Sequence, residues 1–334
     1  NSAINTLVPG SKFRYVSYVG ICASVMIISF YSVVAGWTLE YIVASLGNGF
    51  AGKGPEDFVA SFQNFSQDPF RPVIWLLVFL LLTHFIVVKG VKDGIEKSSK
   101  VMMPVLFILI LVLAGCSLSL PNADLGLEFL LKPDFSKVNA DVFLGAMGQA
   151  FFSLSLGMGC LSTYASYFGS DTQLGKTALS VGVIDTFVAI LAGLIIFPAA
   201  FSVGIQPDAG PSLIFITLPN IFNNMAGGRF WGSLFFLFMT FAAFSTVIAV
   251  FQNIIACARD LWGWSLKKSI LINGVLLLVL SLPCILGMTD WNATCVKILG
   301  EGHDIQWLED FIVSYNLLPI GAAIYLVFCT TRYG

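Results

Sequence analysis

Long apolar runs separated by short polar connections occupy the chain from beginning to end. Crossing the roughly 30 Å hydrocarbon core of a bilayer takes about 20 helical residues, and most of the runs are that long. They predict eight membrane-spanning helices, at residues 15–43, 73–88, 101–120, 142–168, 177–203, 230–258, 269–288 and 311–331. The second run is the shortest and contains His84, which makes it the weakest of the eight patterns.

The fourth run is interrupted in its middle. In QAFFSLSLGMGCLSTYASY, residues 149–167, small and hydroxylated residues surround Gly157 and Gly159. Backbone polar groups in hydrocarbon must be satisfied internally, so a broken helix is tolerated only where it is buried in protein or lines a cavity. The pattern therefore predicts a helix break that is a candidate binding site, of the kind formed by half-helix ends. The alternative is a glycine pair that a continuous membrane helix tolerates.

Composition supports the membrane assignment and excludes other classes. Of the 334 residues, 57% are hydrophobic and 11% are charged, whereas soluble domains carry about 25% charged residues. A net charge of −2 without a Lys/Arg-rich run excludes a nucleic-acid partner. The seven cysteines are scattered without C-x-x-C spacing, which predicts small core residues and neither a disulfide framework nor a metal site.

Lysine and arginine counts predict the orientation, because cytoplasmic connections carry the excess. Eleven of these residues fall on the side where the first run begins and six on the other. We therefore expect a multi-pass protein of the cell membrane, plasma or inner, with both ends of this chain in the cytoplasm. One outer connection, 204–229, is itself apolar. It predicts either a lid-like helical hairpin bent at Pro219 or an interfacial helix.

Asp185 is the candidate for chemistry with the strongest signal, because it is the charged side chain that lies well inside its apolar run. An ionisable group at that depth is a functional-site hypothesis by default, since a lone carboxylate there needs a cation or a proton. The alternative is a carboxylate near the helix end that water solvates. No Ser-His-Asp set can be assembled, because the histidines are His84 and His303 alone.

Hydroxyl groups inside the runs form a second set of candidates. Ser153 and Ser155 flank the predicted break, and Ser245 and Thr246 are adjacent in FSTVIAVFQN. They offer oxygen ligands to an alkali cation, or else they pack between membrane helices. Tyr31 places a phenol at membrane depth, which either donates to a substrate carboxylate or bonds a backbone carbonyl within the bundle.

Several strings together resemble one known family. They are GWTLEYI, KGVKDGIEKSSKVMMPVLFILI, GQAFFSLSLGMG with TYASY, FITLPNIF with AGGRFWG, and FSTVIAVFQN. The resemblance extends from about Phe13 to Arg332. The order and spacing of these strings resemble those in the bacterial amino-acid-transporting members of the neurotransmitter:sodium symporters. The resemblance implies an all-α polytopic membrane fold of two inverted five-helix repeats around a midplane site.

The resemblance also implies which part of that fold the chain holds. A single transporter domain, 1–334, would contain helices three to ten, with 13–141 as a partial first repeat and 142–334 as the second. Helices one and two would precede Asn1, and the family's first helix supplies ligands to substrate and both sodium ions. The chain alone is therefore expected not to transport.

Roles for individual residues follow from the resemblance. Tyr31 would bind the substrate carboxylate and form a gate with Phe152, and Asp310 would be the acidic half of an outer gate. The substrate pocket would be completed by Ile27, Ser155, Met158, Thr246, Ala249 and Val250. The first sodium site would use Ser153 and Asp185, where the family usually has asparagine. The second would use Ala242, Ser245 and Thr246, with the usual Thr-Ser order reversed.

The implied activity is sodium-coupled import of an amino acid with an apolar or aromatic side chain, by alternating access. Chloride-dependent members have a serine where this chain has Ala189, so the Asp185 carboxylate is expected to replace chloride and to cycle a proton on the return step. The expected partners are sodium ions, an amino acid and lipid; no other cofactor and no oligomeric state is predicted.

Two alternatives to the transport function are a non-transporting membrane remnant and a membrane enzyme.

Overall fold

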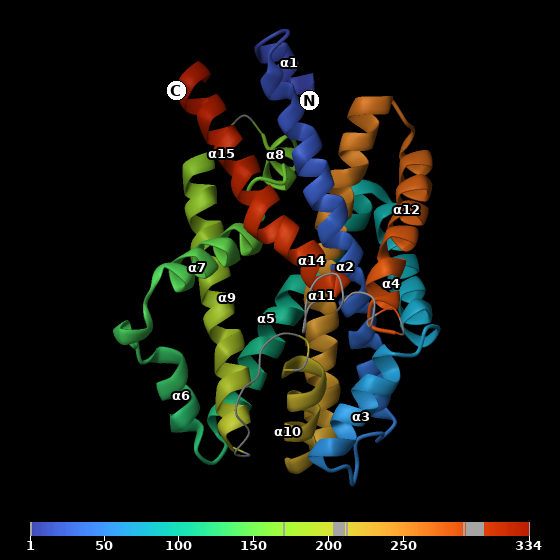
Figure 1. Cartoon of the computed structure of the whole chain (residues 1–334), viewed down its shortest axis with the longest axis vertical. Coiled ribbons are helices and arrows are strands. Elements are labelled where there is room, and N and C mark those ends of the chain that lie inside the picture. Colours follow the sequence, from blue (N-terminus) through green and yellow to red (C-terminus); the bar gives the residue numbers. More distant parts are fainter. Residues whose placement is uncertain are drawn as a thin grey trace.

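The computed structural model describes residues 2–169, 171–202, 211, 213–289, 291 and 304–333, and all the regular secondary structure in them is helical. The helices form an elongated bundle, and the first and last helices end at the same end of it (Figure 1). The predicted all-α class is confirmed.

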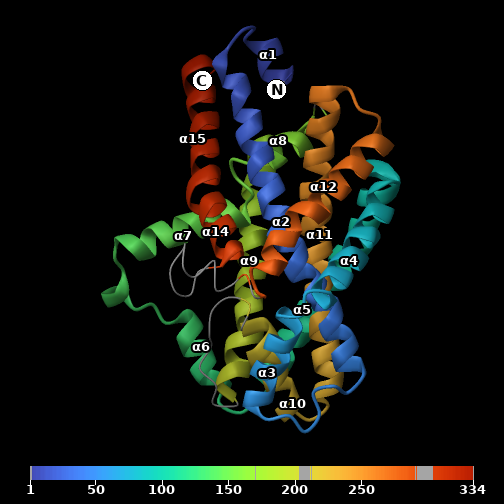
Figure 2. The ribbon, with the colours of Figure 1, turned by 45° about the vertical axis from the view of Figure 1, so that its right-hand side comes forward.

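The two longest helices form the centre of the bundle. α2 (Val16–Leu46) and α11 (Gly228–Trp262) run antiparallel and contact each other along much of their length (Figures 1 and 2). Both are apolar around their whole circumference, which is typical of a helix buried inside a membrane bundle. Midway along the pair, the Thr38 and Thr240 hydroxyls lie 2.8 Å apart and hydrogen-bond.

One flank of this pair is covered by a bent pair of helices and by α12. α3 (Pro55–Ser66) and α4 (Arg71–Val87) meet at an angle of 72°. α12 (Leu266–Leu286) packs against both α2 and α4. Glu40 of α2 forms an ion pair with Arg71, which fixes the start of α4 against the central pair.

The opposite flank contains α5 (Lys97–Leu118), α6 (Ala123–Leu131) and α9 (Leu174–Ser202). The Ser117 hydroxyl donates to the carbonyl of Ile195 at 2.7 Å and joins α5 to α9. Only 11% of the most apolar stretch of α9 is buried, the smallest share of any span in the described chain. α9 therefore presents an apolar face that the described residues leave uncovered.

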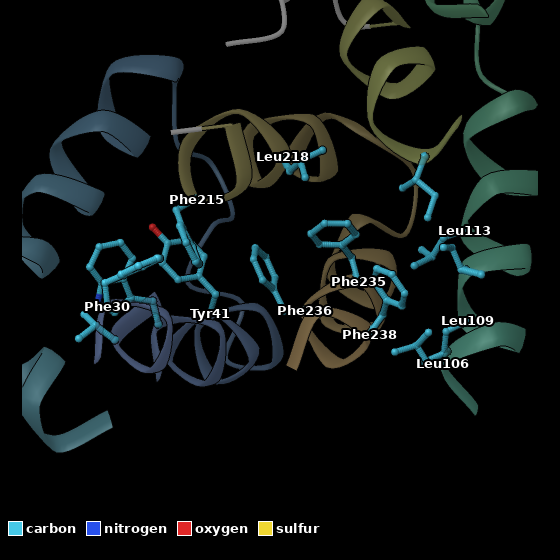
Figure 3. Packing of buried hydrophobic residues seen from close by; sticks show 14 of the residues in the cluster. Phe30, Tyr41, Leu106, Leu109, Leu113, Phe215, Leu218, Phe235, Phe236 and Phe238 are labelled. Carbon is cyan, nitrogen blue, oxygen red and sulfur yellow. The ribbon is translucent and has the colours of Figure 1, made fainter. Parts of the chain in front are cut away.

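A short helix closes one end of the bundle. The π-helical turn η4 (Leu213–Thr217) continues directly into α10 (Leu218–Asn224), and Pro219 lies in the first turn of α10. The Phe215 ring packs against Tyr41 with centroids 4.9 Å apart, and Phe236 of α11 lies beside them (Figure 3). Proline fits the first turn of a helix, and the lid-like hairpin and the interfacial helix both stay predictions for this connection. Residues 203–210 and 212 lie outside the described part.

All eight predicted apolar runs fall on helices of the described chain, but not every run forms one long helix. Six described helices are long and apolar enough to cross a membrane, or seven if α3 and α4 count as one bent span. The second run lies in the 17-residue helix α4, and the fourth is divided into α7 (Ala140–Ser153) and α8 (Cys160–Ala165). The six are Val16–Leu46, Asp93–Leu118, Leu174–Ser202, Gly228–Trp262, Leu266–Leu286 and Ile305–Thr331.

The last span is formed by several consecutive helical pieces. They are α14 (Ile305–Ile312), η5 (Val313–Leu317), α15 (Leu318–Phe328) and η6 (Cys329–Tyr333). The remaining short elements are α1 (Ser2–Leu7), η1 (Lys12–Tyr15), η2 (Val91–Glu96) and η3 (Phe135–Lys137).

Candidate functional site

The fourth apolar run is broken, as its sequence predicts. α7 ends at Ser153, α8 begins at Cys160, and the residues between them are not helical. Ser155 has φ +53°, and Gly157 and Gly159 have φ +80° and +81°. The left-handed region favours glycine, so a serine held there is a strained residue of the kind that clusters at functional sites. The break is therefore a specific feature of the fold.

Backbone-to-backbone packing holds the break in place. A Cβ added at Gly157 would lie 2.1 Å from the Leu318 carbonyl oxygen, and one at Gly321 would lie 2.4 Å from the Gly157 carbonyl oxygen. On the other side, a Cβ at Gly20 of α2 would lie 2.6 Å from the carbonyl oxygen of Met158. No side chain fits at these distances, so glycines allow α2 and α15 to clamp the break.

A buried hydrogen-bond network satisfies the polar groups that the break exposes. The Asn253 amide of α11 donates to the Ser24 hydroxyl at 2.9 Å and to the Met158 carbonyl at 3.3 Å. The Asn253 side-chain oxygen accepts from the Thr163 hydroxyl at 2.6 Å. Ser24 and Asn253 are 0% and 1% exposed. This network joins α2, α8 and α11 at the break.

Ser153 and Asp185 are brought together from different helices. The Ser153 hydroxyl, at the C-terminal end of α7, donates to a carboxylate oxygen of Asp185 in α9. The C-terminal end of a helix carries partial negative charge from its unsatisfied carbonyls. A carboxylate, a hydroxyl and this helix end together form an oxygen-rich, negative position that suits a hard monovalent cation.

A second oxygen cluster lies within one turn of α11. The Ala242 carbonyl accepts from the Ser245 hydroxyl at 2.8 Å and from the Thr246 hydroxyl at 3.3 Å. The Tyr31 hydroxyl of α2 interacts with the Thr246 side chain. The structure thus places Tyr31 beside the predicted second sodium ligands, and both hydroxyls of the pair retain lone pairs for a cation.

The predicted pocket residues occupy different environments. Ile27, Val250 and Met158 are buried, at 4%, 4% and 2% exposed, whereas Tyr31 and Phe152 are only partly buried and pack at the edge of the core. The Ala249 carbonyl accepts from the Tyr164 hydroxyl at 3.5 Å. These contacts distribute the pocket candidates over α2, the break and α11.

A cavity of about 250 Å³, lined by both apolar and polar residues, lies beside the break, on the side of the chain termini. Met158, Gly159 and Thr163 line it from the break and α8, Asp260 from α11 and Tyr325 from α15. The break thus borders a space that leads toward one end of the bundle.

Asp310 lies in α14, away from the break in sequence. Its carboxylate accepts from the Ser314 hydroxyl at 2.7 Å. The neighbouring Glu309 accepts from the Cys284 thiol of α12 at 2.9 Å. The acidic half of the predicted outer gate is thus held by its own helix.

The described residues contain no group of three or more His, Cys, Asp or Glu side chains that would hold a metal ion. The oxygen clusters around Ser153 and Ala242 instead consist of hydroxyls, carbonyls and one carboxylate. Such ligands suit hard cations.

Comparison with known proteins identifies the family. The Sodium:neurotransmitter symporter family matches residues 58–329. The chain belongs to this family. YhdH, an uncharacterized sodium-dependent transporter of Bacillus subtilis (strain 168), is 36% identical over 320 residues, which cover 96% of this chain and 70% of YhdH. A sodium-dependent transporter of Haemophilus influenzae is 33% identical over 326 residues, covering 95% of this chain and 71% of that relative.

A solved structure gives the same result for the fold. MhsT in complex with L-phenylalanine matches this symporter with a TM-score of 0.91 and 36% identity, covering 100% of this chain and 75% of MhsT. The symporter is therefore a multi-pass membrane protein of a secondary transporter family, and not an enzyme. The sodium-dependent relatives imply that sodium is its coupling ion.

Sequence reasoning missed two residues of the symporter's break. Ser24 and Asn253 lie in long apolar runs, and neither was singled out as a candidate. Asn253 could have been found from the sequence, because an amide side chain inside an apolar membrane span requires hydrogen-bond partners. The contacts to Ser24 and Met158 join residues that are more than 90 positions apart in the chain, and no local pattern reveals such pairs.

Proposed function

We propose that the full-length symporter imports a zwitterionic amino acid by alternating access, driven by the sodium gradient. The observation that carries the proposal is the contact of Ser153 with Asp185 at the break between α7 and α8. It supplies a negative, oxygen-rich position at the point where a membrane helix exposes its end. The family assignment and the bound L-phenylalanine of MhsT support the same activity.

The first sodium site in this proposal is formed by Ser153 and Asp185. The serine hydroxyl has one proton and two lone pairs, so it donates to the carboxylate while it still offers a lone pair to an ion. Sodium binding between the two neutralises a carboxylate that would otherwise be costly at membrane depth. Ions and substrate would thus stabilise each other at the same break.

The second sodium site would use the carbonyl of Ala242 and the hydroxyls of Ser245 and Thr246. In the structure both hydroxyls bond the Ala242 carbonyl, so a rotation about one side-chain torsion redirects each oxygen toward an ion. Because Tyr31 touches Thr246, occupancy of this site is linked to the residue proposed to bind the substrate carboxylate.

An apolar or aromatic substrate side chain fits the residues proposed for the pocket. Ile27, Met158, Ala249 and Val250 carry no charge, and a charged substrate side chain would lack a partner among them. Ser155 and Thr246 add hydroxyls. Phe152 and Tyr31 would close over the substrate on one side, and the cavity beside Met158 provides the path on the other. Asp310 would take part in the outer gate.

We further propose that transport is independent of chloride. Asp185 places a fixed negative charge beside the first sodium site, and Ala189, one helical turn further along α9, has no hydroxyl to bind an anion. Asp185 would return in its protonated form, which removes the cost of a bare carboxylate after sodium leaves.

Uptake by the full-length protein in proteoliposomes tests this function. With a panel of radiolabelled amino acids, we expect accumulation of apolar or aromatic ones only when an inward sodium gradient is imposed. A non-transporting membrane protein is the alternative, and it would show no accumulation of any amino acid under the same gradient. The predicted inverted repeats, 13–141 and 142–334, and the cytoplasmic location of both chain ends belong to the same proposal.

A further inference from the structure

An apolar groove with an internal volume of about 230 Å³ lies on the outer surface of the bundle, away from the break. α4 lines it with residues from Leu77 to His84, α12 with residues from Leu271 to Leu278, and α11 with Val247 and Phe251. Several of these side chains are exposed, including Leu81 at 58% and Val275 at 56%. An exposed apolar surface of this kind suits contact with lipid.

One glycine leaves the groove open. A Cβ added at Gly274, in the interior of α12, would meet nothing within 4 Å. Glycine in a helix interior is unfavourable relative to alanine, and no neighbour within the described chain requires it at this position. A molecule that fills the groove explains the glycine, because a side chain there would occupy the space that the molecule uses.

A polar group without a partner lies at one end of the groove. The hydroxyl of Thr83 donates to the Phe79 carbonyl at 3.0 Å, so it is satisfied within α4. The imidazole of His84, in contrast, makes no hydrogen bond within the described part of the chain. An unpartnered imidazole in an apolar groove indicates an occupant with a hydrogen-bond acceptor at this position.

Positive charge lies at the same end of the groove. Lys267 and Lys268 precede Leu271 by one helical turn, so they extend the row of α12 residues that lines the groove. Lys89 follows the end of α4, and its ammonium lies 4.3 Å from the Phe85 ring centre. The Lys268 ammonium lies 5.2 Å from the ring centre of Trp264. Lysines with aromatic neighbours at helix ends are typical of the headgroup level of a bilayer.

We infer that this groove binds an anionic phospholipid. One acyl chain would lie along Leu77, Gly274 and Leu278, an ester oxygen would accept from His84, and the phosphate would lie near Lys268 and Lys89. The order of groups along the groove, from cationic to hydrogen-bonding to apolar, matches the order of groups in such a lipid. The site is separate from the proposed sodium sites, although Val247 of the groove directly follows Thr246 in α11.

Native mass spectrometry of the full-length protein tests the inference. The protein would be released from mild detergent after incubation with phosphatidylglycerol and phosphatidylcholine of identical acyl chains. We expect at least fivefold more retained phosphatidylglycerol than phosphatidylcholine. Gly274→Leu, which fills the groove, should reduce the retained lipid about tenfold, since 1.4 kcal/mol corresponds to a factor of ten.

A matched control separates filling of this groove from a general effect on the surface. Gly115 of α5 is likewise a helical glycine whose added Cβ would meet nothing within 4 Å, and it lies outside the groove. Gly115→Leu should retain the lipid at the wild-type level. The double variant Lys267→Gln with Lys268→Gln should retain both lipids equally.

Two results would overturn the inference: equal lipid retention by the Gly274→Leu and Gly115→Leu variants, or no preference for phosphatidylglycerol in the wild type. If Gly274→Leu does not fold, Val275→Trp fills the groove from its exposed rim. Undiminished lipid binding in a folded Val275→Trp variant would then be decisive against it.

Discussion

Replacing Asn253 by leucine removes the centre of the hydrogen-bond network at the helix break while it keeps the number and branching of the side chain's heavy atoms. The amide donates to Ser24 and to the Met158 carbonyl and accepts from Thr163, at 2.9, 3.3 and 2.6 Å. Leucine makes none of these bonds. The substitution therefore removes the polar network while it leaves a side chain of the same branching in place.

The expected loss can be worked from these three bonds. Interhelical hydrogen bonds in membranes average about 0.6 kcal/mol each, which gives about 2 kcal/mol for the network. The Met158 carbonyl would keep the Ser24 hydroxyl as a donor at 3.5 Å, whereas the partly buried Thr163 hydroxyl would lose its acceptor. A buried group left unsatisfied costs about 1–3 kcal/mol. We expect the Asn253→Leu variant to lose about 2–4 kcal/mol of unfolding free energy.

Equilibrium unfolding of the detergent-solubilised full-length protein measures this loss. Thr240→Val is the matched control, because Thr240 lies on the same helix and bonds the same partner helix through a single hydroxyl pair. The Thr240→Val variant is expected to lose about 1 kcal/mol of unfolding free energy. An Asn253→Leu variant as stable as the wild type, or no less stable than Thr240→Val, would refute the idea that the network holds the break.

Three further substitutions test the site. Gly321→Ala places a Cβ 2.4 Å from the Gly157 carbonyl oxygen, and this overpacking should cost about 1–3 kcal/mol of unfolding free energy. Thermal unfolding measures the cost, and the control Gly115→Ala should leave the stability unchanged or raise it. Ser153→Ala should raise the sodium concentration for half-maximal uptake about tenfold, or about 1.4 kcal/mol, and unchanged sodium dependence would contradict its role as a ligand. Tyr31→Phe should raise the KM for the amino acid about tenfold in uptake assays with little change in stability; an unchanged KM would remove Tyr31 from the substrate site.

Local sequence patterns predicted those parts of the fold that depend on local chemistry. The length of apolar runs located the spans, and Gly157 with Gly159 located the break, because helix breaks in a bilayer require specific residues at the break itself. Six of the eight runs form single helices long enough to cross a membrane, because the fourth run is divided at its break and the second forms the shorter helix α4, which meets α3 at 72°.

Contacts between distant residues were beyond such patterns. The pair of Ser153 with Asp185 spans 32 positions, and only the family resemblance placed the two residues at one site. Asn253 and Ser24 are 229 positions apart, and neither the pattern nor the resemblance indicated them. The glycines that clamp the break, Gly20 and Gly321, resemble any other helix glycine until the opposing backbone is known.

Sodium-driven uptake by the full-length protein with and without chloride tests the central claim most directly. In proteoliposomes with an inward sodium gradient, wild-type uptake should be the same in chloride and in gluconate. Asp185→Asn should abolish uptake in gluconate, since it removes the fixed negative charge beside the first sodium site. Wild-type uptake that requires chloride, or full chloride-independent uptake by Asp185→Asn, would contradict the account.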